Sequence, residues 1–119
     1  MNINEAIAEF ISIEGVIAAM VVDSSNGMIL GAKAIKDFDT DMAAAGNTEV
    51  VQAKRKTMKM LAIDDKIEDM LITLGKQFHL IAPLASNDEV FGYIVVDRKG
   101  ANLGMARAKI RATMDELMV

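Results

Sequence analysis

Residues 16–34 read VIAAMVVDSSNGMILGAKA and contain the strongest fold signal of this chain. The first seven residues, 16–22, are all apolar, which is typical of a central strand covered on both of its faces. Asn26 and Gly27 follow, and both residue types tolerate the positive φ angles that tight hairpin turns require. Met28–Ala34 is then the returning strand. The stretch predicts an antiparallel hairpin at the centre of a sheet.

Apolar residues that recur every three or four positions predict a helix at each end of the chain. The first helix is expected to take Asn4 as its N-cap, and its buried face consists of Ile3, Ala6, Ile7, Phe10 and Ile11. The last helix is expected to take Asn102 as its N-cap, and its buried face consists of Leu103, Ala106, Ile110, Met114 and Leu117. A longer middle helix is predicted over residues 40–63, and Asp64 and Asp65 are expected to end it.

Three further strands are predicted over residues 67–74, Gln77–Leu84 and 90–97, with short turns between them. Pro83 is expected near a strand end, because proline cannot donate to a strand ladder. The predicted order is therefore α-β-β-α-β-β-β-α. Since consecutive strands joined by short turns pair antiparallel, the prediction is an α/β (α+β) fold with one five-stranded antiparallel sheet and helices on both faces. Residues 1–119 are expected to form a single domain.

The composition is that of a domain stabilised by an apolar core. Of the 119 residues, 52 % are apolar and none is cysteine, so disulfides, thiol catalysis and thiolate metal sites are excluded. The net charge of −4 creates no overall field that would attract nucleic acid or anionic lipid. The N-terminal residues lack the positive region of a signal peptide, and the longest apolar run is too short to cross a bilayer. We expect a cytoplasmic protein without nucleic-acid binding or membrane insertion.

The predicted middle helix has more apolar surface than one sheet covers. One stripe, named here the Gly46 stripe, consists of Ala43, Gly46, Val50, Ala53, Thr57, Met60 and Leu61. A second, the Val51 stripe, lies about 100° away around the helix and consists of Ala44, Val51, Met58 and Ala62. Together they span about 200°, whereas one buried face needs an arc of about 100° or slightly more. One stripe is expected to face the helix's own sheet and the other a different partner; a helix sunk more deeply into its own fold is the alternative.

A second copy of the chain is the preferred partner for the free stripe, because twofold self-association is the commonest form of oligomer. Glycine within a helix costs about 1 kcal/mol relative to alanine, and close packing of another backbone at Gly46 would compensate for that cost. The helix residues predicted in the dimer interface are Ala43, Ala44, Gly46, Val50, Val51, Ala53 and Met58.

Residues 54–59, KRKTMK, form the only basic cluster of this acidic chain. A solvated helix face is the default interpretation. A docking surface for an acidic protein is the alternative. Nucleic acid is a weaker option, because no aromatic residues alternate with the charges.

No combination of residues predicts an active site, a metal or a cofactor. His79, the only histidine, lies in an alternating strand and is expected to be structural, since no nucleophile motif accompanies it. Asp23 and Asp97 each end an apolar strand, and paired carboxylates are able to bind a metal or act as acid and base. Turn formation is the favoured interpretation of both. Residues 100–104, GANLG, lack the pattern of a phosphate-binding loop.

The order and spacing of several short motifs resemble the Roadblock / dynein light chain family. Residues 15–23, GVIAAMVVD, followed by NGMIL at 26–30, look like the family's first hairpin. IAPL at 81–84 and YIVVD at 93–97 look like its later strands, and GANLGMAR at 100–107 resembles the start of its last helix. The resemblance extends over residues 3–117 and implies a profilin-like sandwich, close to that of the bacterial gliding-motility regulators.

The resemblance implies a homodimer in which the middle helices of the two copies, residues 40–63, pack together. It also implies that the following strand, residues 67–74, pairs with its own copy in a ten-stranded sheet, which adds Met70 and Ile72 to the predicted interface. Members of the family scaffold or regulate Ras-like small GTPases or bind motor subunits. The implied partner surface consists of Gln52, Arg55, Lys56 and Lys59. A small-molecule sensor of the profilin-like or PAS-like type is the alternative function.

Overall fold

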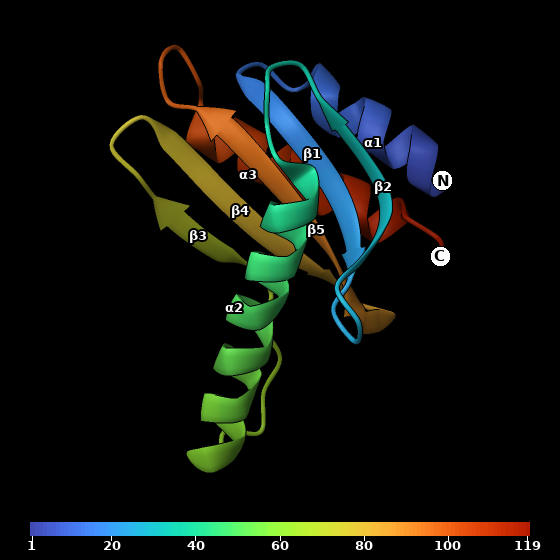
Figure 1. The fold of residues 1–119 in the computed structure, drawn as a ribbon, viewed down its shortest axis with the longest axis vertical. Helices are drawn as coiled ribbons and strands as arrows, with labels where there is room; N and C mark the ends of the chain where they lie inside the picture. The colour runs from blue at the N-terminus through green and yellow to red at the C-terminus, as the bar shows by residue number, and fades with distance from the viewer.

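The computed structural model describes residues 1–119, and it places one antiparallel sheet between two helices on one face and a single helix on the other (Figure 1). In chain order the elements are α1 (Ile3–Ser12), β1 (Val16–Asp23), β2 (Met28–Ala34), α2 (Thr40–Met60), β3 (Met70–Thr73), β4 (Gln77–Leu84), β5 (Asn87–Asp97) and α3 (Leu103–Glu116). The predicted order and sheet type are confirmed. Across the sheet the order is β2-β1-β5-β4-β3, so β2 and β3 are the two edges.

β1 is the central strand that its sequence predicts. All residues from Val16 to Val22 are buried, because α1 and α3 cover one side of β1 and α2 covers the other. Successive side chains point to opposite faces of a strand, so Val21 joins the core beneath α1 and α3 while Val22 joins the core beneath α2. The turn to β2 has Gly27 at φ 73°, a conformation in which residues with a Cβ are strained.

The two cores differ in size. Seventeen buried residues lie between the sheet and the pair α1 and α3, whereas ten form the core on the α2 side. Ala44 and Val51 are the only buried members that α2 contributes. The α2 face of the sheet is therefore the less completely covered one. None of the helices combines the length and apolar composition needed to cross a membrane.

Three element boundaries differ from the sequence prediction. α2 ends at Met60 rather than at residue 63, because Ala62 adopts a left-handed conformation with φ 55° and the amide of Ile63 turns back to donate to the carbonyl of Met58 at 2.9 Å. Residues 62–69 then run back alongside α2, and β3 begins only at Met70 (Figure 1). β5 begins at Asn87, three residues before its predicted start.

Side-chain caps fix the ends of the terminal helices. Asn2, rather than the predicted Asn4, caps α1: its side chain accepts from the amide of Glu5 at 2.8 Å, and the Glu5 carboxylate accepts from the amide of Asn2 at 3.0 Å. This reciprocal capping box satisfies two amides that the helix itself leaves free. Asn102 caps α3 as predicted, accepting from the amide of Met105 at 3.0 Å.

A helix face and a sheet edge as a candidate protein interface

α2 is longer than the sheet that it covers. Its C-terminal half projects past the ends of the strands, as Figure 1 shows. Of its 21 residues only Ala44, Thr48 and Val51 are buried, and all three lie on the side of the Val51 stripe. The part of the Val51 stripe that contains Ala44 and Val51 therefore faces the chain's own sheet, which the sequence alone left undecided, whereas Met58 is only half-buried. Ala44 and Val51 are 1 % and 0 % exposed, so their prediction as dimer-interface residues is wrong.

Apart from Ala43, which packs against the core beneath α2, the Gly46 stripe faces away from the sheet. Val50 is 39 % exposed, and Met60 and Leu61, at the projecting end, are 75 % and 64 % exposed. Apart from the neighbouring backbone of α2 itself, no atom lies within 4 Å of the position that a Cβ would occupy at Gly46. Met42, which is not among the predicted interface residues, is 72 % exposed on the same side of the first turn and extends the apolar surface. Its helical spacing from Ala53 and Met60 was the available signal.

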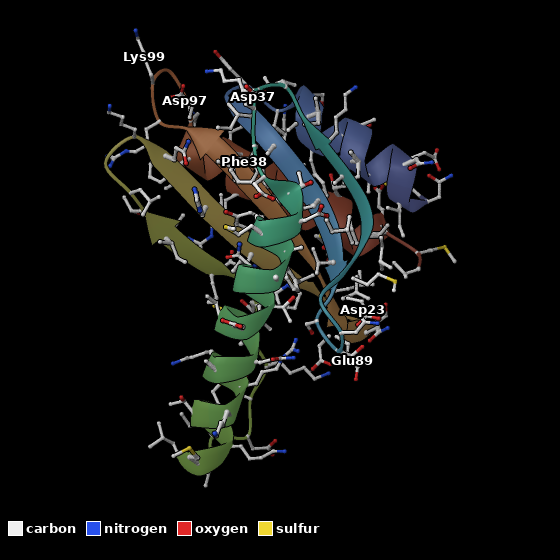
Figure 2. All side chains as sticks on the ribbon, viewed as in Figure 1. Asp23, Asp37, Phe38, Glu89, Asp97 and Lys99 are labelled. Atoms are coloured by element: carbon white, nitrogen blue, oxygen red, sulfur yellow. The ribbon has the colours of Figure 1, made fainter.

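Gln52 and Arg55 attach the opposite side of α2 to the β1–β2 turn. The Gln52 Nε2 donates to the carbonyl of Ser24 at 2.7 Å, and an Arg55 guanidinium nitrogen donates to the Ser24 hydroxyl at 3.1 Å. Arg55 also donates to the carbonyl of Asp88 at the start of β5. These contacts lie at the foot of the sheet, where Figure 2 labels Asp23 and Glu89. Since residues two apart on a helix differ by about 200°, Val50 points away from this turn.

The four predicted partner residues therefore divide into two pairs. Gln52 and Arg55 have internal hydrogen bonds, so Arg55 in particular is a structural clamp rather than a free contact residue. Lys56 and Lys59 are exposed, and neither ammonium group has an ion pair or hydrogen bond within the chain.

β3 is an edge strand of the sheet, and its other side has no partner strand within the chain. It pairs only with β4, in a register that places Met70 opposite Ile81 and Ile72 opposite His79. Met70 packs against the core beneath α2, and by the alternation of a strand Ile72 points to the same face, where it is 37 % exposed. The sequence of β3, MLIT, contains neither a charge nor a proline to protect the edge. Met70 and Ile72 thus lie on the same face of the sheet as α2.

A hydrogen-bonded group lies beside this edge on β4 and β5. The Tyr93 hydroxyl lies 2.8 Å from Nδ1 of His79, and Nε2 of His79 lies 2.8 Å from Oε1 of Gln77. A neutral imidazole satisfies both contacts, accepting from Tyr93 and donating to Gln77. Burial lowers the pKa of His79 and raises that of Tyr93, so both stay uncharged at neutral pH. Both ring nitrogens of the only histidine are thus occupied within the sheet.

Asp23 and Asp97 are not a carboxylate pair. β1 and β5 are antiparallel and adjacent, so Asp23 and Asp97, the last residues of these strands, lie at opposite ends of the sheet, as Figure 2 shows. Asp23 accepts from the amide and hydroxyl of Ser25, hydrogen bonds that lower the pKa of its carboxyl, and Asp97 accepts from the amide of Lys99. Both are turn residues, as the favoured interpretation predicted. No group of three or more His, Asp or Glu side chains in the chain is arranged to hold a metal ion.

Comparison with known proteins identifies the fold. No protein-family model and no curated protein sequence matches the chain. Among solved structures, MglB of Myxococcus xanthus is 19 % identical, with 96 % of this chain and 89 % of that chain covered and a TM-score of 0.83. A Roadblock/LC7 domain from Streptomyces avermitilis is 8 % identical over 98 % of this chain and 94 % of that one, with a TM-score of 0.81.

Two further structures agree. The gliding protein MglB of Thermus thermophilus is 16 % identical over 94 % of this chain and 82 % of that one, with a TM-score of 0.80. A structure described as MglB with a tetrameric arrangement is 16 % identical, with 95 % and 82 % of the two chains covered and a TM-score of 0.81. The chain thus has the Roadblock/LC7 fold of the MglB proteins, which is the fold that the resemblance of its sequence motifs implied.

Proposed function

We propose that the chain is a non-catalytic, cytoplasmic regulatory module that forms a homodimer and binds a Ras-like small GTPase. The observation that carries the proposal is the position of the Gly46 stripe: an exposed apolar helix face on the same side of the sheet as an unprotected strand edge. Neither surface has a partner within the chain.

A twofold axis beside β3 would cover both surfaces at once. The free edge of β3 would pair with its own copy and extend the sheet, which removes an exposed edge. Because α2 lies on the same face as Met70 and Ile72, the same rotation would bring the two α2 helices together on that face. The proposed interface consists of Ala43, Gly46, Val50, Ala53, Met58, Met70 and Ile72, without the two buried residues of the earlier prediction.

The small residues of the stripe support close helix packing. Gly46 has open space around it within one chain, so nothing inside the chain requires a glycine there. A helical glycine is disfavoured by about 1 kcal/mol relative to alanine. Close approach of the twin's backbone would account for it. The tetrameric arrangement described for one MglB structure supports self-association as a property of this fold.

The GTPase partner is proposed for the basic side of α2. Lys56 and Lys59 keep their charges free, and a cationic patch on an acidic chain steers an acidic partner surface toward itself. Since the family resemblance implies regulation of Ras-like GTPases through the paired helices, such a GTPase is the partner class to test.

Sedimentation equilibrium of two variants with the same substitution tests the dimer. Ala53→Glu places a charge in the Gly46 stripe, and Ala45→Glu places it on an exposed position of the same helix outside that stripe. We expect Ala53→Glu to be monomeric and Ala45→Glu to remain dimeric. Equal behaviour of the two variants would refute this interface.

Binding of purified Ras-like small GTPases, loaded with GDP or with a GTP analogue, tests the partner. The double variant Lys56→Glu/Lys59→Glu is expected to remain dimeric but to bind more weakly. If the natural chain is dimeric but binds no small GTPase in either nucleotide state, the proposed partner is refuted and the proposed dimer is not.

A further inference from the structure

A groove of about 290 Å³ opens on the face of the sheet opposite α2, between α3 and the segment that leads into β3. Its floor is apolar. Leu80, Ala82 and Leu84 of β4 point into it from the sheet, and Ile110 and Met114 of α3 form its wall. The volume is near the lower end of the range for small-molecule sites, about 300 Å³.

Charged side chains form the rim of this groove, and one ion pair there is complete. The guanidinium of Arg107 donates to both carboxylate oxygens of Asp69, at 2.7 and 2.6 Å. These hydrogen bonds lower the pKa of Asp69, so its charge is present and neutralised at neutral pH. One edge of the Arg107 guanidinium is therefore occupied by Asp69, and the two side chains together have no net charge that would repel an anion in the groove.

Arg111, one turn further along α3, has no such partner. Its nearest carboxylate oxygens, on Asp69 and Glu68, are 3.6 and 3.8 Å away, which is beyond hydrogen-bond distance. Its side chain is 48 % exposed and lines the groove together with Lys66. The rim thus contains an arginine that has two long ion pairs but no hydrogen bond within the chain, in the lining of a groove whose floor is apolar.

From this juxtaposition we infer that the groove binds a small monocarboxylate with an apolar body. The apolar body would leave water and pack against the leucine side chains of the floor and Met114 of the wall, and burial of the ligand's apolar surface is the main source of affinity in such a site. The carboxylate would take two parallel hydrogen bonds from the Arg111 fork, the geometry for which arginine is best suited.

The remaining rim charges select for a single negative charge. Glu68, Asp88 and Asp115 also line the groove, and of these three carboxylates only Glu68 has an ion pair, with Arg111 at 3.8 Å. They would repel a dianion or a phosphate ester more strongly than a monoanion. The ligand class is therefore an aliphatic or aromatic monocarboxylate. This site lies on the other face of the sheet from the proposed dimer and GTPase surfaces, so it stands or falls independently of them.

Octanoate is a suitable probe, followed by amide chemical shifts in an NMR titration of the full chain. We expect saturable shifts confined to β4 and α3. Arg111→Gln should weaken octanoate binding by about tenfold or more, since hydrogen bonds to a charged group contribute about 1.5–3 kcal/mol. Lys109→Gln, which removes the same charge from the same helix outside the groove, should leave binding unchanged.

Two further measurements distinguish specific binding at this site from nonspecific binding to apolar surface. 1-Octanol, which lacks the charge, should bind the natural chain more weakly than octanoate does. It should bind the natural chain and the Arg111→Gln variant with equal affinity. Ala82→Phe, which fills the floor, should abolish binding of both probes. Octanoate shifts centred on α2, or an Arg111→Gln variant that binds octanoate as well as the natural chain does, would overturn the inference.

Discussion

Val50 and Val51 are neighbours in α2 with opposite surroundings: Val51 is completely buried, whereas 39 % of Val50 is exposed. The sheet of the same chain accounts for Val51. The chain leaves a large part of Val50 exposed, although Val50 belongs to a stripe of apolar and small residues. The contrast between two identical side chains indicates that α2 has two apolar faces and that only one of them is used within the monomer.

Gly46→Ala should have opposite effects on the monomer and on the dimer. In the monomer the added methyl group meets no atom within 4 Å, and alanine favours the helix, so the free energy of unfolding should rise by up to about 1 kcal/mol. In the dimer the methyl group would separate the two helix backbones and weaken association. Urea unfolding in the Ala53→Glu background measures the first effect, and sedimentation equilibrium of Gly46→Ala alone measures the second. A dimer strengthened by Gly46→Ala would exclude close packing at this position.

Arg55→Ala should destabilise the fold, whereas Lys56→Ala should not. Arg55 holds α2 to Ser24 and to Asp88, and loss of hydrogen bonds from a charged donor costs about 1–3 kcal/mol. Lys56 has no partner in the chain, so its removal should change the unfolding free energy by less than about 0.5 kcal/mol. Urea denaturation of both variants is the measurement. Equal stabilities would show that Arg55 is not the clamp described above.

Asp69→Asn should remove an acid-sensitive part of the stability. The hydrogen bonds from Arg107 hold the pKa of Asp69 below its ordinary value of 3.8. A carboxyl with a depressed folded-state pKa contributes stability that is present above pH 3.8 and is lost as the pH falls through the folded-state pKa. Because Arg107 is 46 % exposed, the cost of the substitution at neutral pH should be near 1 kcal/mol.

Unfolding curves from pH 7 down into the acid range check this expectation. The difference between the natural chain and Asp69→Asn should shrink as the pH falls below 3.8. Glu68→Gln is the control, since its carboxylate is 3.8 Å from Arg111 and its side chain 79 % exposed. A difference that stays constant with pH would contradict the role of the Asp69 charge.

His79→Gln should flatten the pH dependence of stability in weakly acidic solution. Burial depresses the pKa of His79 below its ordinary value of 6.5, so between that value and the folded-state pKa the unfolded chain binds a proton that the folded chain does not. The stability of the natural chain should therefore fall as the pH is lowered through 6.5. The variant lacks this titration. Urea unfolding at fixed protein concentration compares the two, and parallel pH profiles would count against a neutral, half-buried imidazole.

The sequence contained enough information for the fold because its local signals agree with one another. An all-apolar strand, an Asn-Gly turn and an Asn cap each specify a local conformation without help from distant residues. The end of α2 could not be predicted in this way. Ala62 adopts a left-handed conformation that alanine disfavours locally, and the return of the chain toward β3 imposes it.

The interface residues were predictable only in part. Both stripes of α2 are apolar, so the sequence contained no signal that would assign one of them to the sheet. Tertiary contacts determine which side of α2 faces the sheet: Thr48 is buried there, and Arg55 forms hydrogen bonds to Ser24 and Asp88. From the sequence of a basic cluster, an arginine that binds a turn of its own chain cannot be distinguished from one that is free to bind another protein. The groove lined by Leu80 could not be predicted from the sequence either, because Asp69 and Arg107 are far apart in the sequence and only the fold brings them into contact.

Sedimentation equilibrium of the natural chain over a wide range of concentrations is the most direct test of the dimer. A homodimer built on the Gly46 stripe and the β3 edge predicts a mass of twice the 12.9 kDa of one chain, falling toward 12.9 kDa only on strong dilution. A mass of 12.9 kDa at every concentration, in a fully folded protein, would contradict it.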